Sequence, residues 1–170
     1  MKLLLIVMLL ISLEGVYQRE IGVREQSGNN DGAKVEEYLK YVGLKRGSPW
    51  CAAFVCWSLA QAGIENPRSG WSPDLFPGVK ICWQRSSGVQ LNSLKSLASV
   101  PCQGDVFGIF FPSKNRIAHV GFVDSWGEKY VITVEGNTNE AGSREGDGVY
   151  RKRRLIISIY RVAKWRADHE

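Results

Sequence analysis

Four residues of this chain have the side-chain types that a thiol-dependent acyl-transfer site requires. Cys51 would supply a nucleophile and His119 a general base, while Glu135 or Asn137 would orient the imidazole. The chain contains only 2 histidines. The other one, His169, lies near the C-terminus, where nothing would hold it in place. Chemistry that depends on histidine therefore points to His119.

Cys51 stands at the beginning of a predicted helix, after Pro49, which keeps the preceding chain extended. A helix N-terminus favours the thiolate over the thiol. The alternative is that Cys51 is a small buried residue like many other cysteines on helices. Cys56 provides an internal control, because it lies about 140° around the same helix and should pack rather than react.

His119 lies in the alternating segment 117–124, which predicts a strand, and a second predicted strand begins at residue 130. If residues 125–129 form the hairpin loop, His119 lies opposite Glu135, with Cβ atoms about 5 Å apart. A slip of two residues would place Asn137 there instead. Because Glu135 and Asn137 share a face, either register offers an acceptor. The competing interpretation is that His119 is a core residue.

The elements that would position these residues change in type along the chain. Pro and Gly punctuate residues 64–101 so often that we expect mostly loop with short helical turns. Helical spacing precedes that segment and alternation follows it, which predicts an α+β domain. The predicted helices cover 33–42 and 51–62, and the predicted strands cover 106–111, 117–124 and 130–135, with one or two more within 154–163.

The composition is that of a globular domain. The 170 residues include 44% hydrophobic residues and a net charge of 22 − 17 = +5, which excludes disordered, collagen-like and polytopic membrane proteins. The 4 cysteines are too few for a disulfide scaffold and lack the CxxC spacing of a structural zinc site. A bridge between Cys82 and Cys102 is conceivable but has no support in the sequence.

The N-terminus has the charged start and short apolar segment of a secretory signal. Lys2 precedes a predominantly apolar run, Leu3 to Leu13, which is shorter than the roughly 20 residues that span a bilayer as a helix. We therefore predict a signal peptide at residues 1–15 and a single domain at 16–170. The alternative is a buried first helix of the domain.

Positive charge and tryptophan invite further interpretations. The basic cluster near the C-terminus is expected to be a solvated, alternating strand edge, and the functional alternative is attraction to an anionic envelope or polymer. No nucleic-acid recognition motif accompanies it. Trp50 and Trp71 could line a cleft near Cys51. The cluster comprises Arg151, Lys152, Arg153, Arg154, Arg161, Lys164 and Arg166.

Four ordered blocks of the sequence resemble the CHAP family of cysteine, histidine-dependent amidohydrolases and peptidases, and the likeness extends from about Ile21 to Tyr150. The resemblance implies a papain-like α+β fold, similar to the NlpC/P60 group, with N-terminal helices and the nucleophile at a helix N-terminus packed on an antiparallel sheet. The blocks are Pro49–Val55, Gly104–Val106, Ala118–Gly121 and Val134–Asn137.

The same resemblance makes Cys51 the nucleophile, His119 the general base and Glu135 the orienter, with Asn137 as a further polar participant beside them. The segment from Asn29 to Asp31 could contribute or could only cap the following helix. It has one carboxylate and lacks the aspartate-rich pattern of calcium-binding members, so no metal is expected, and no cofactor is required.

Family members typically cleave amide bonds in peptidoglycan, so the expected activity is that of an N-acetylmuramoyl-L-alanine amidase or a peptide endopeptidase. The alternatives are a cysteine acyltransferase or transglutaminase-like enzyme and a non-catalytic wall-binding module. The expected partners are peptidoglycan or its stem peptides, in a secreted, periplasmic or envelope location, without stable membrane insertion after processing. The oligomeric state, the bond cleaved and the biological role stay open.

Overall fold

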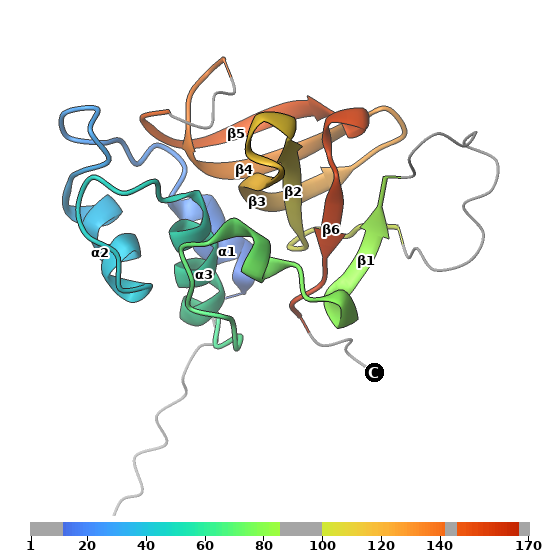
Figure 1. The fold of residues 1–170 in the computed structure, drawn as a ribbon, viewed down its shortest axis with the longest axis horizontal. Coiled ribbons are helices and arrows are strands. Elements are labelled where there is room, and N and C mark those ends of the chain that lie inside the picture. The colour runs from blue at the N-terminus through green and yellow to red at the C-terminus, as the bar shows by residue number, and fades with distance from the viewer. Residues whose placement is uncertain (1–11, 86–99, 142–145, 167–170) are drawn as a thin grey trace, which may run out of the picture.

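The fold places three helices on one side of an antiparallel sheet (Figure 1). The structure is a computed structural model, and it describes residues 12–85, 100–141 and 146–166. Within these residues the helices are α1 (Leu13–Arg19), α2 (Ala33–Tyr41) and α3 (Cys51–Gln61). The architecture is α+β and consistent with the papain-like fold that the sequence predicts.

The described sheet has six strands in the order β1-β6-β2-β3-β4-β5, and all neighbours are antiparallel. Strands β2 to β5 follow one another in the chain and in the sheet, whereas β6 returns to pair with β2 and carries β1 at the edge. The strands are β1 (Ile81–Gln84), β2 (Val106–Phe111), β3 (Arg116–Trp126), β4 (Tyr130–Thr138), β5 (Gly148–Leu155) and β6 (Arg161–Ala163). Short 3₁₀ helices are η1 (Ser72–Leu75), η2 (Gly78–Lys80), η3 (Pro112–Lys114) and η4 (Ile156–Ser158).

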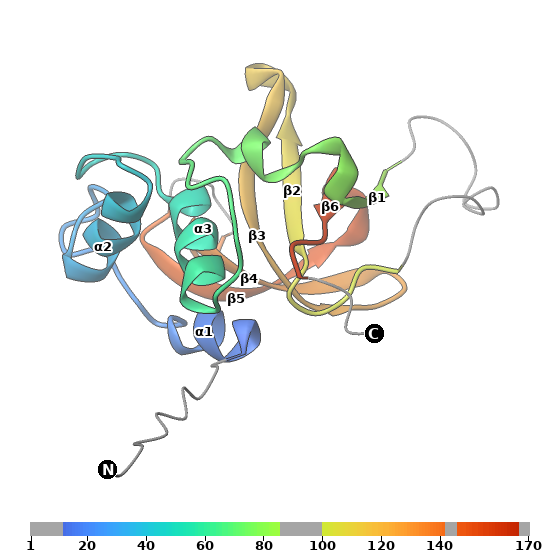
Figure 2. The ribbon, with the colours of Figure 1, turned by 90° about the horizontal axis from the view of Figure 1, so that it is seen from below.

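Helix α3 is the central helix of the domain. It contacts α1, α2, β3 and β4, and Figure 2 shows it between α2 and β3. Residues 51–59 of this helix are all buried, as expected for a helix that is apolar around its whole circumference. Tyr38 of α2 packs its ring against Trp50 and Phe54, which fixes the beginning of α3.

The two faces of the sheet belong to separate apolar clusters. Val106, Phe122 and Val134 join the cluster that contains α3. Phe107 and Val123 lie in a second cluster, on the opposite face, because successive strand residues alternate between faces. The sheet therefore carries buried apolar residues on both of its faces.

Most predicted elements are confirmed. Both predicted helices are present and each ends one residue early, β2 has the predicted bounds, and β3 and β4 extend beyond them. Strand β5 begins at Gly148, well before the predicted start at residue 154, because residues 151–154 are all Arg or Lys and show no apolar alternation. Strand β1 lies in the segment expected to be mostly loop, beside the expected short turns η1 and η2.

Helix α1 includes residues that the predicted signal-peptide boundary would remove. Ser12 accepts a hydrogen bond from the Gly15 backbone at 3.1 Å, Leu13 is buried, and Glu14 forms an ion pair with Arg166 at 2.6 Å. Cleavage after Gly15 would remove these contacts. The signal peptide at residues 1–15 stays a prediction. Residues 1–11 and His169 lie outside the described residues. Within the part of the chain that is described, no helix has the length and apolar character to cross a membrane.

Candidate active site

Cys51 is the first residue of α3 and is 6% exposed. The preceding residue, Trp50, is the N-cap and offers no side-chain hydrogen bond to the helix. Its own backbone N–H donates to Asn137 Oδ1 of β4 at 3.0 Å, so the start of α3 is tied to the sheet. The first backbone N–H groups of a helix have no partner within the helix, which leaves that of Cys51 available to an anion.

The environment of Cys51 favours its ionised form. Burial raises the pKa of the thiol, but a hydrogen bond and the charge of His119, a hydrogen bond from Ser72 and the backbone of Val120 lower it, and the net direction is downward. The Ser72 hydroxyl lies 3.8 Å from Cys51 Sγ. Ser72 was not predicted as a site residue, because nothing in the punctuated segment 64–101 distinguishes it from a turn serine.

His119 is buried between the cysteine and an acidic residue. Its Nε2 lies 2.8 Å from Glu135 Oε2, and its Nδ1 is buried without a standard hydrogen bond to any described residue, which leaves Nδ1 available to the Cys51 thiol. Burial lowers the pKa of His119, but the interactions with Cys51 and Glu135 outweigh it and raise the pKa to about 9. Cys51 and His119 are thus disposed to form a thiolate–imidazolium pair.

Glu135 is fully buried and accepts four hydrogen bonds. One comes from His119, and another comes from the Thr133 hydroxyl at 2.5 Å. Arg154 supplies the other two, from Nε at 2.6 Å and Nη2 at 2.5 Å. Burial raises the pKa of the Glu135 carboxyl, but Arg154 and His119 lower it to about 2, so the group is an anion at neutral pH.

Arg154 is the partner that the sequence analysis missed. The basic cluster was expected to be a solvated, alternating edge, and Arg151 and Arg153 of β5 are indeed exposed. The Arg154 side chain is only 15% exposed, and its guanidinium lies against the buried Glu135 carboxylate. The alternation itself carried the signal, because it places residues 152 and 154 on the opposite face from 151 and 153.

The hairpin register differs from the predicted one by two residues. Phe122 pairs with Val134, and Val123 with Thr133, where the predicted register pairs Phe122 with Ile132. A β-bulge at Asp124 and a loop shorter than expected account for the slip. Between Phe122–Val134 and Val123–Thr133 the slip is two residues, which leaves the side chains on that side of the bulge on their predicted faces, whereas Ser125 and Trp126 beyond it are out of phase by one. His119 and Glu135 therefore still share a face and meet, as predicted, but along a diagonal of the sheet.

Asn137 forms its hydrogen bonds with groups other than His119 among the described residues, and its expected role as a polar participant beside the imidazole stays a prediction. Its Oδ1 accepts from the Trp50 backbone, and its Nδ2 donates to Asn30 Oδ1 and the Gly146 carbonyl, both at 3.0 Å. Its backbone has φ of 55°, a conformation that asparagine tolerates better than most residues. Asn137 thus holds the start of α3.

In the segment Asn29–Asp31, the side chains of Asn30 and Asp31 bind other parts of the domain. Asn30 binds Asn137, as described above. Asp31 does not cap α2, whose N-cap is Gly32 without a side-chain hydrogen bond. Its carboxylate instead accepts from Ser27 and forms an ion pair with Arg46 at 2.6 Å.

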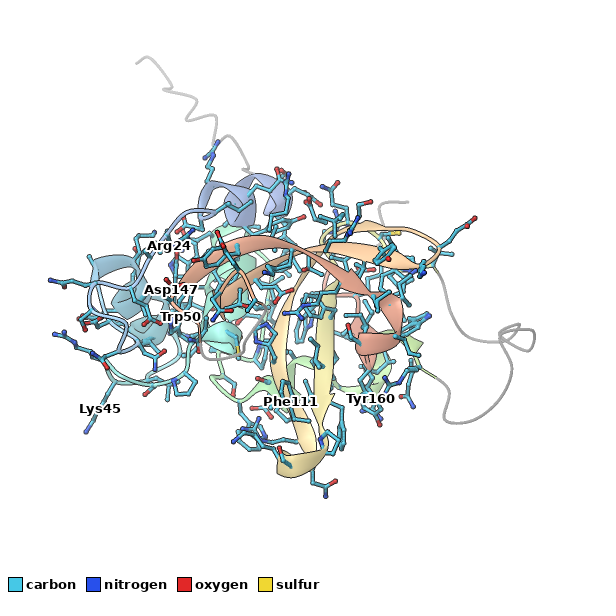
Figure 3. The ribbon with its side chains drawn as sticks, turned by 90° about the horizontal axis from the view of Figure 1, so that it is seen from above. Arg24, Lys45, Trp50, Phe111, Asp147 and Tyr160 are labelled. Atoms are coloured by element: carbon cyan, nitrogen blue, oxygen red, sulfur yellow. The ribbon has the colours of Figure 1, made fainter. Side chains whose placement is uncertain are left out.

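The two tryptophans near the site differ in exposure. Trp50 is fully buried, and its Nε1 donates to Glu25 at 2.8 Å, so it does not line an open cleft as one interpretation expected (Figure 3). Trp71 is 50% exposed and precedes Ser72, and the Arg116 guanidinium lies 3.9 Å from its ring centroid. Of the two, Trp71 is therefore the one whose side chain is open to solvent.

The remaining cysteines lie apart from this site. Cys56 is fully buried and its thiol donates to the Ser69 carbonyl at 3.4 Å. Burial raises its pKa to about 11, in agreement with the expectation that it packs rather than reacts. Cys82 and Cys102 are both free thiols in the structure.

Comparisons with known proteins identify the family. The CHAP domain matches residues 43–137, more than half of the chain, a range that contains Cys51, His119, Glu135 and Asn137. No curated protein and no solved structure matched the chain. The chain therefore belongs to the CHAP domain family, whose members generally act on peptidoglycan as cysteine- and histidine-dependent amidohydrolases or peptidases.

Proposed function

We propose that this protein hydrolyses an amide bond in peptidoglycan, with Cys51 as nucleophile, His119 as general acid and base, and Glu135 as the group that orients the imidazole. The observation that carries the proposal is the buried His119–Glu135 contact at 2.8 Å, which leaves the Nδ1 of His119, unpartnered among the described residues, for the Cys51 thiol, whose pKa His119 lowers. A buried ion chain is costly unless each charge has a partner, so its presence at a helix N-terminus favours chemistry over packing.

In the first half of the reaction, the Cys51 thiolate attacks the carbonyl carbon of the amide and forms a tetrahedral oxyanion. The backbone N–H of Cys51 is one donor to that oxyanion. The C–N bond then breaks, the His119 imidazolium gives its proton to the departing amine, and a thioester to Cys51 remains.

In the second half, neutral His119 takes a proton from water, and the resulting hydroxide attacks the thioester carbonyl. The C–S bond breaks, the product leaves as a carboxylic acid, and Cys51 returns as a thiolate beside a protonated His119. Glu135 keeps the Nε2–H of the imidazole directed toward itself throughout, so Nδ1 carries the proton that moves. The cycle needs only these side chains and water.

The proposed activity has consequences for the location of the protein, its domain organisation and the bond that it cleaves. A peptidoglycan substrate implies a secreted, periplasmic or envelope location. The proposed organisation is a signal peptide within residues 1–15 followed by a single catalytic domain. The bond is either the lactyl amide that an N-acetylmuramoyl-L-alanine amidase cleaves or a peptide bond within the stem.

The test is mass spectrometry of muropeptides released from purified sacculi by the wild-type protein, by Cys51→Ala and by the matched control Cys56→Ala. We expect new products from the wild type and Cys56→Ala only, and the mass of each product identifies the bond. Amine incorporation without net hydrolysis would assign an acyltransferase instead. Binding to sacculi that Cys51→Ala leaves intact, with no product from any variant, would contradict catalysis.

A further inference from the structure

We propose that Arg154 is a positioning residue of this site, because its guanidinium holds both oxygens of Glu135 and so fixes the anion that orients His119. The inference rests on the proposed function and extends the site to β5, outside the range 43–137 that matches the family. Arg154 is not a catalytic residue in this proposal, since it reaches the reacting atoms only through Glu135 and His119.

The geometry is a fork against a carboxylate. Nε of Arg154 donates to Oε1 of Glu135 at 2.6 Å, and Nη2 donates to Oε2 at 2.5 Å. Such two-point contacts fix orientation as well as charge, which a lysine ammonium cannot do. Oε2 is the same oxygen that binds His119 Nε2, so the guanidinium determines where that acceptor lies.

The pairing of the strands explains why an arginine is needed. Arg154 pairs in register with Val131, whereas the residue directly across from Glu135 is Tyr150. The guanidinium therefore reaches Glu135 diagonally along the shared face of β4 and β5, a span that requires a long side chain.

The catalytic cycle gives the pair a specific task. His119 loses its positive charge when it protonates the leaving amine, and at that moment Glu135 would be a buried anion without a counter-ion. An unpaired buried charge costs several kcal/mol. Arg154 is permanently charged, so it keeps Glu135 ionised and in place in both protonation states of His119.

Among the described residues, the charged or titratable groups that contact Glu135 are His119 from β3 and Arg154 from β5, and the Thr133 hydroxyl approaches from its own strand. Cys51 of α3 enters through its interaction with His119. Removing Arg154 takes away the strongest opposing effect to burial, so the pKa of Glu135 should rise.

The experiment is a double-mutant cycle read out by the rate at which iodoacetamide alkylates Cys51, followed by peptide mass spectrometry across a range of pH. The variants are Arg154→Met, Glu135→Gln and the double variant, with Arg154→Lys as the conservative change. Arg153→Met is the matched control, because Arg153 is the exposed neighbour on the same strand. Thermal unfolding of each variant reports folding separately.

We expect Arg154→Met to slow alkylation about 10- to 100-fold, the usual cost of removing a group that orients a functional imidazole. The acidic limb of its alkylation-rate profile should move to higher pH by about one unit or more. Arg154→Lys should have the acidic limb of the wild-type profile but a lower alkylation rate than the wild type. In the Glu135→Gln background, Arg154→Met should cause little further loss, and Arg153→Met should behave as the wild type.

An equal loss from Arg154→Met in both backgrounds, or an unchanged pH profile in a folded variant, would overturn the proposal. If Arg154→Met alone does not fold, the double variant and Arg154→Lys still decide, because both avoid an unpaired buried anion. Failure of the proposed function looks different. The wild type would then release no muropeptides while the coupling between Arg154 and Glu135 at Cys51 persisted.

Discussion

The two cysteines of α3 lie on one helix, five positions apart, and their thiols are perturbed in opposite directions. Cys51 and Cys56 are both buried, at 6% and 0% exposure. The pKa of Cys51 is lowered, whereas burial raises that of Cys56 to about 11. Burial acts in the same direction on both, so it cannot be the cause of the difference.

The difference lies in what the rest of the fold brings to each thiol. Cys51 meets a protonatable imidazole from β3 and a hydroxyl from η1. The Cys56 thiol donates to the Ser69 carbonyl, and the backbone of Ser69 and Arg68 lowers its pKa too little to offset burial and the charge of Asp74. The lowered pKa of Cys51 is therefore produced by tertiary contacts with His119 and Ser72, which Cys56 lacks.

The largest expected effect separates the two thiols directly. Cys51→Ala should reduce peptidoglycan hydrolysis by at least about 10³-fold, because no other nucleophile replaces the thiolate. Cys56→Ala should keep most activity and lose about 1 kcal/mol of unfolding free energy through lost packing. Initial hydrolysis rates and denaturant unfolding measure the two quantities. Loss of activity confined to the Cys56 variant would reverse the assignment.

The next effect removes the charge that distinguishes the surroundings of Cys51. Glu135→Gln should lower kcat by about 100-fold with little change in KM, since the imidazole loses its anionic partner while the substrate surface is untouched. The pKa of His119 should fall, because Glu135 is one of the groups that raise it. Steady-state kinetics across pH would show both, and a KM effect without a kcat effect would argue against the orienting role.

The pH dependence of activity should report the Cys51–His119 pair, which Cys56 lacks. The Cys51–His119 pair is competent when the thiol has lost its proton and the imidazole has kept its own. Activity should rise with pH through the lowered pKa of Cys51 and fall as His119 deprotonates near pH 9, which gives a bell-shaped kcat/KM profile. A profile that keeps rising above pH 9, as for an isolated thiol, would contradict the pair.

The smallest expected effect concerns the hydroxyl beside Cys51. Ser72→Ala removes a donor that helps to lower the pKa of Cys51, so the acidic limb should move upward and the rate near neutral pH should fall a few-fold. Ser69→Ala is the control, because Ser69 is a half-buried serine on the same connection whose hydroxyl bonds Asp74 and the Trp71 backbone, with no hydrogen bond to Cys51 among the described contacts. Equal effects from the two changes would assign Ser72 a structural role only.

The sequence was sufficient to predict much of this site, because its polar residues stand in strongly periodic segments. The helix that begins at Cys51 and the strand that carries His119 are both as expected. The register was off by two residues, yet the contact of His119 with Glu135 survived. A strand has a period of two, so an even slip changes neighbours without changing faces.

The parts that could not be predicted depend on contacts between distant segments. Ser72 reaches Cys51 only through the path of an irregular connection that has no periodicity. Arg154 was assigned to a solvated edge because the start of β5 was placed six residues too late, which hid the face that it occupies. The hydrogen bond from the Trp50 backbone to Asn137 Oδ1 also joins segments far apart in the chain, and no periodicity indicates it.

The central claim is that the surroundings of Cys51, which include His119, make it a reactive thiol, and competitive labelling of the two α3 cysteines tests it most directly. The wild type and His119→Ala would be treated with iodoacetamide at several pH values, and labelling at Cys51 and Cys56 would be quantified by peptide mass spectrometry in the same sample. We predict that Cys51 is alkylated much faster than Cys56 below pH 8. The alkylation rate of Cys51 should be much lower in His119→Ala than in the wild type. Labelling of Cys51 no faster than an unstructured thiol, and indifferent to His119, would contradict the account.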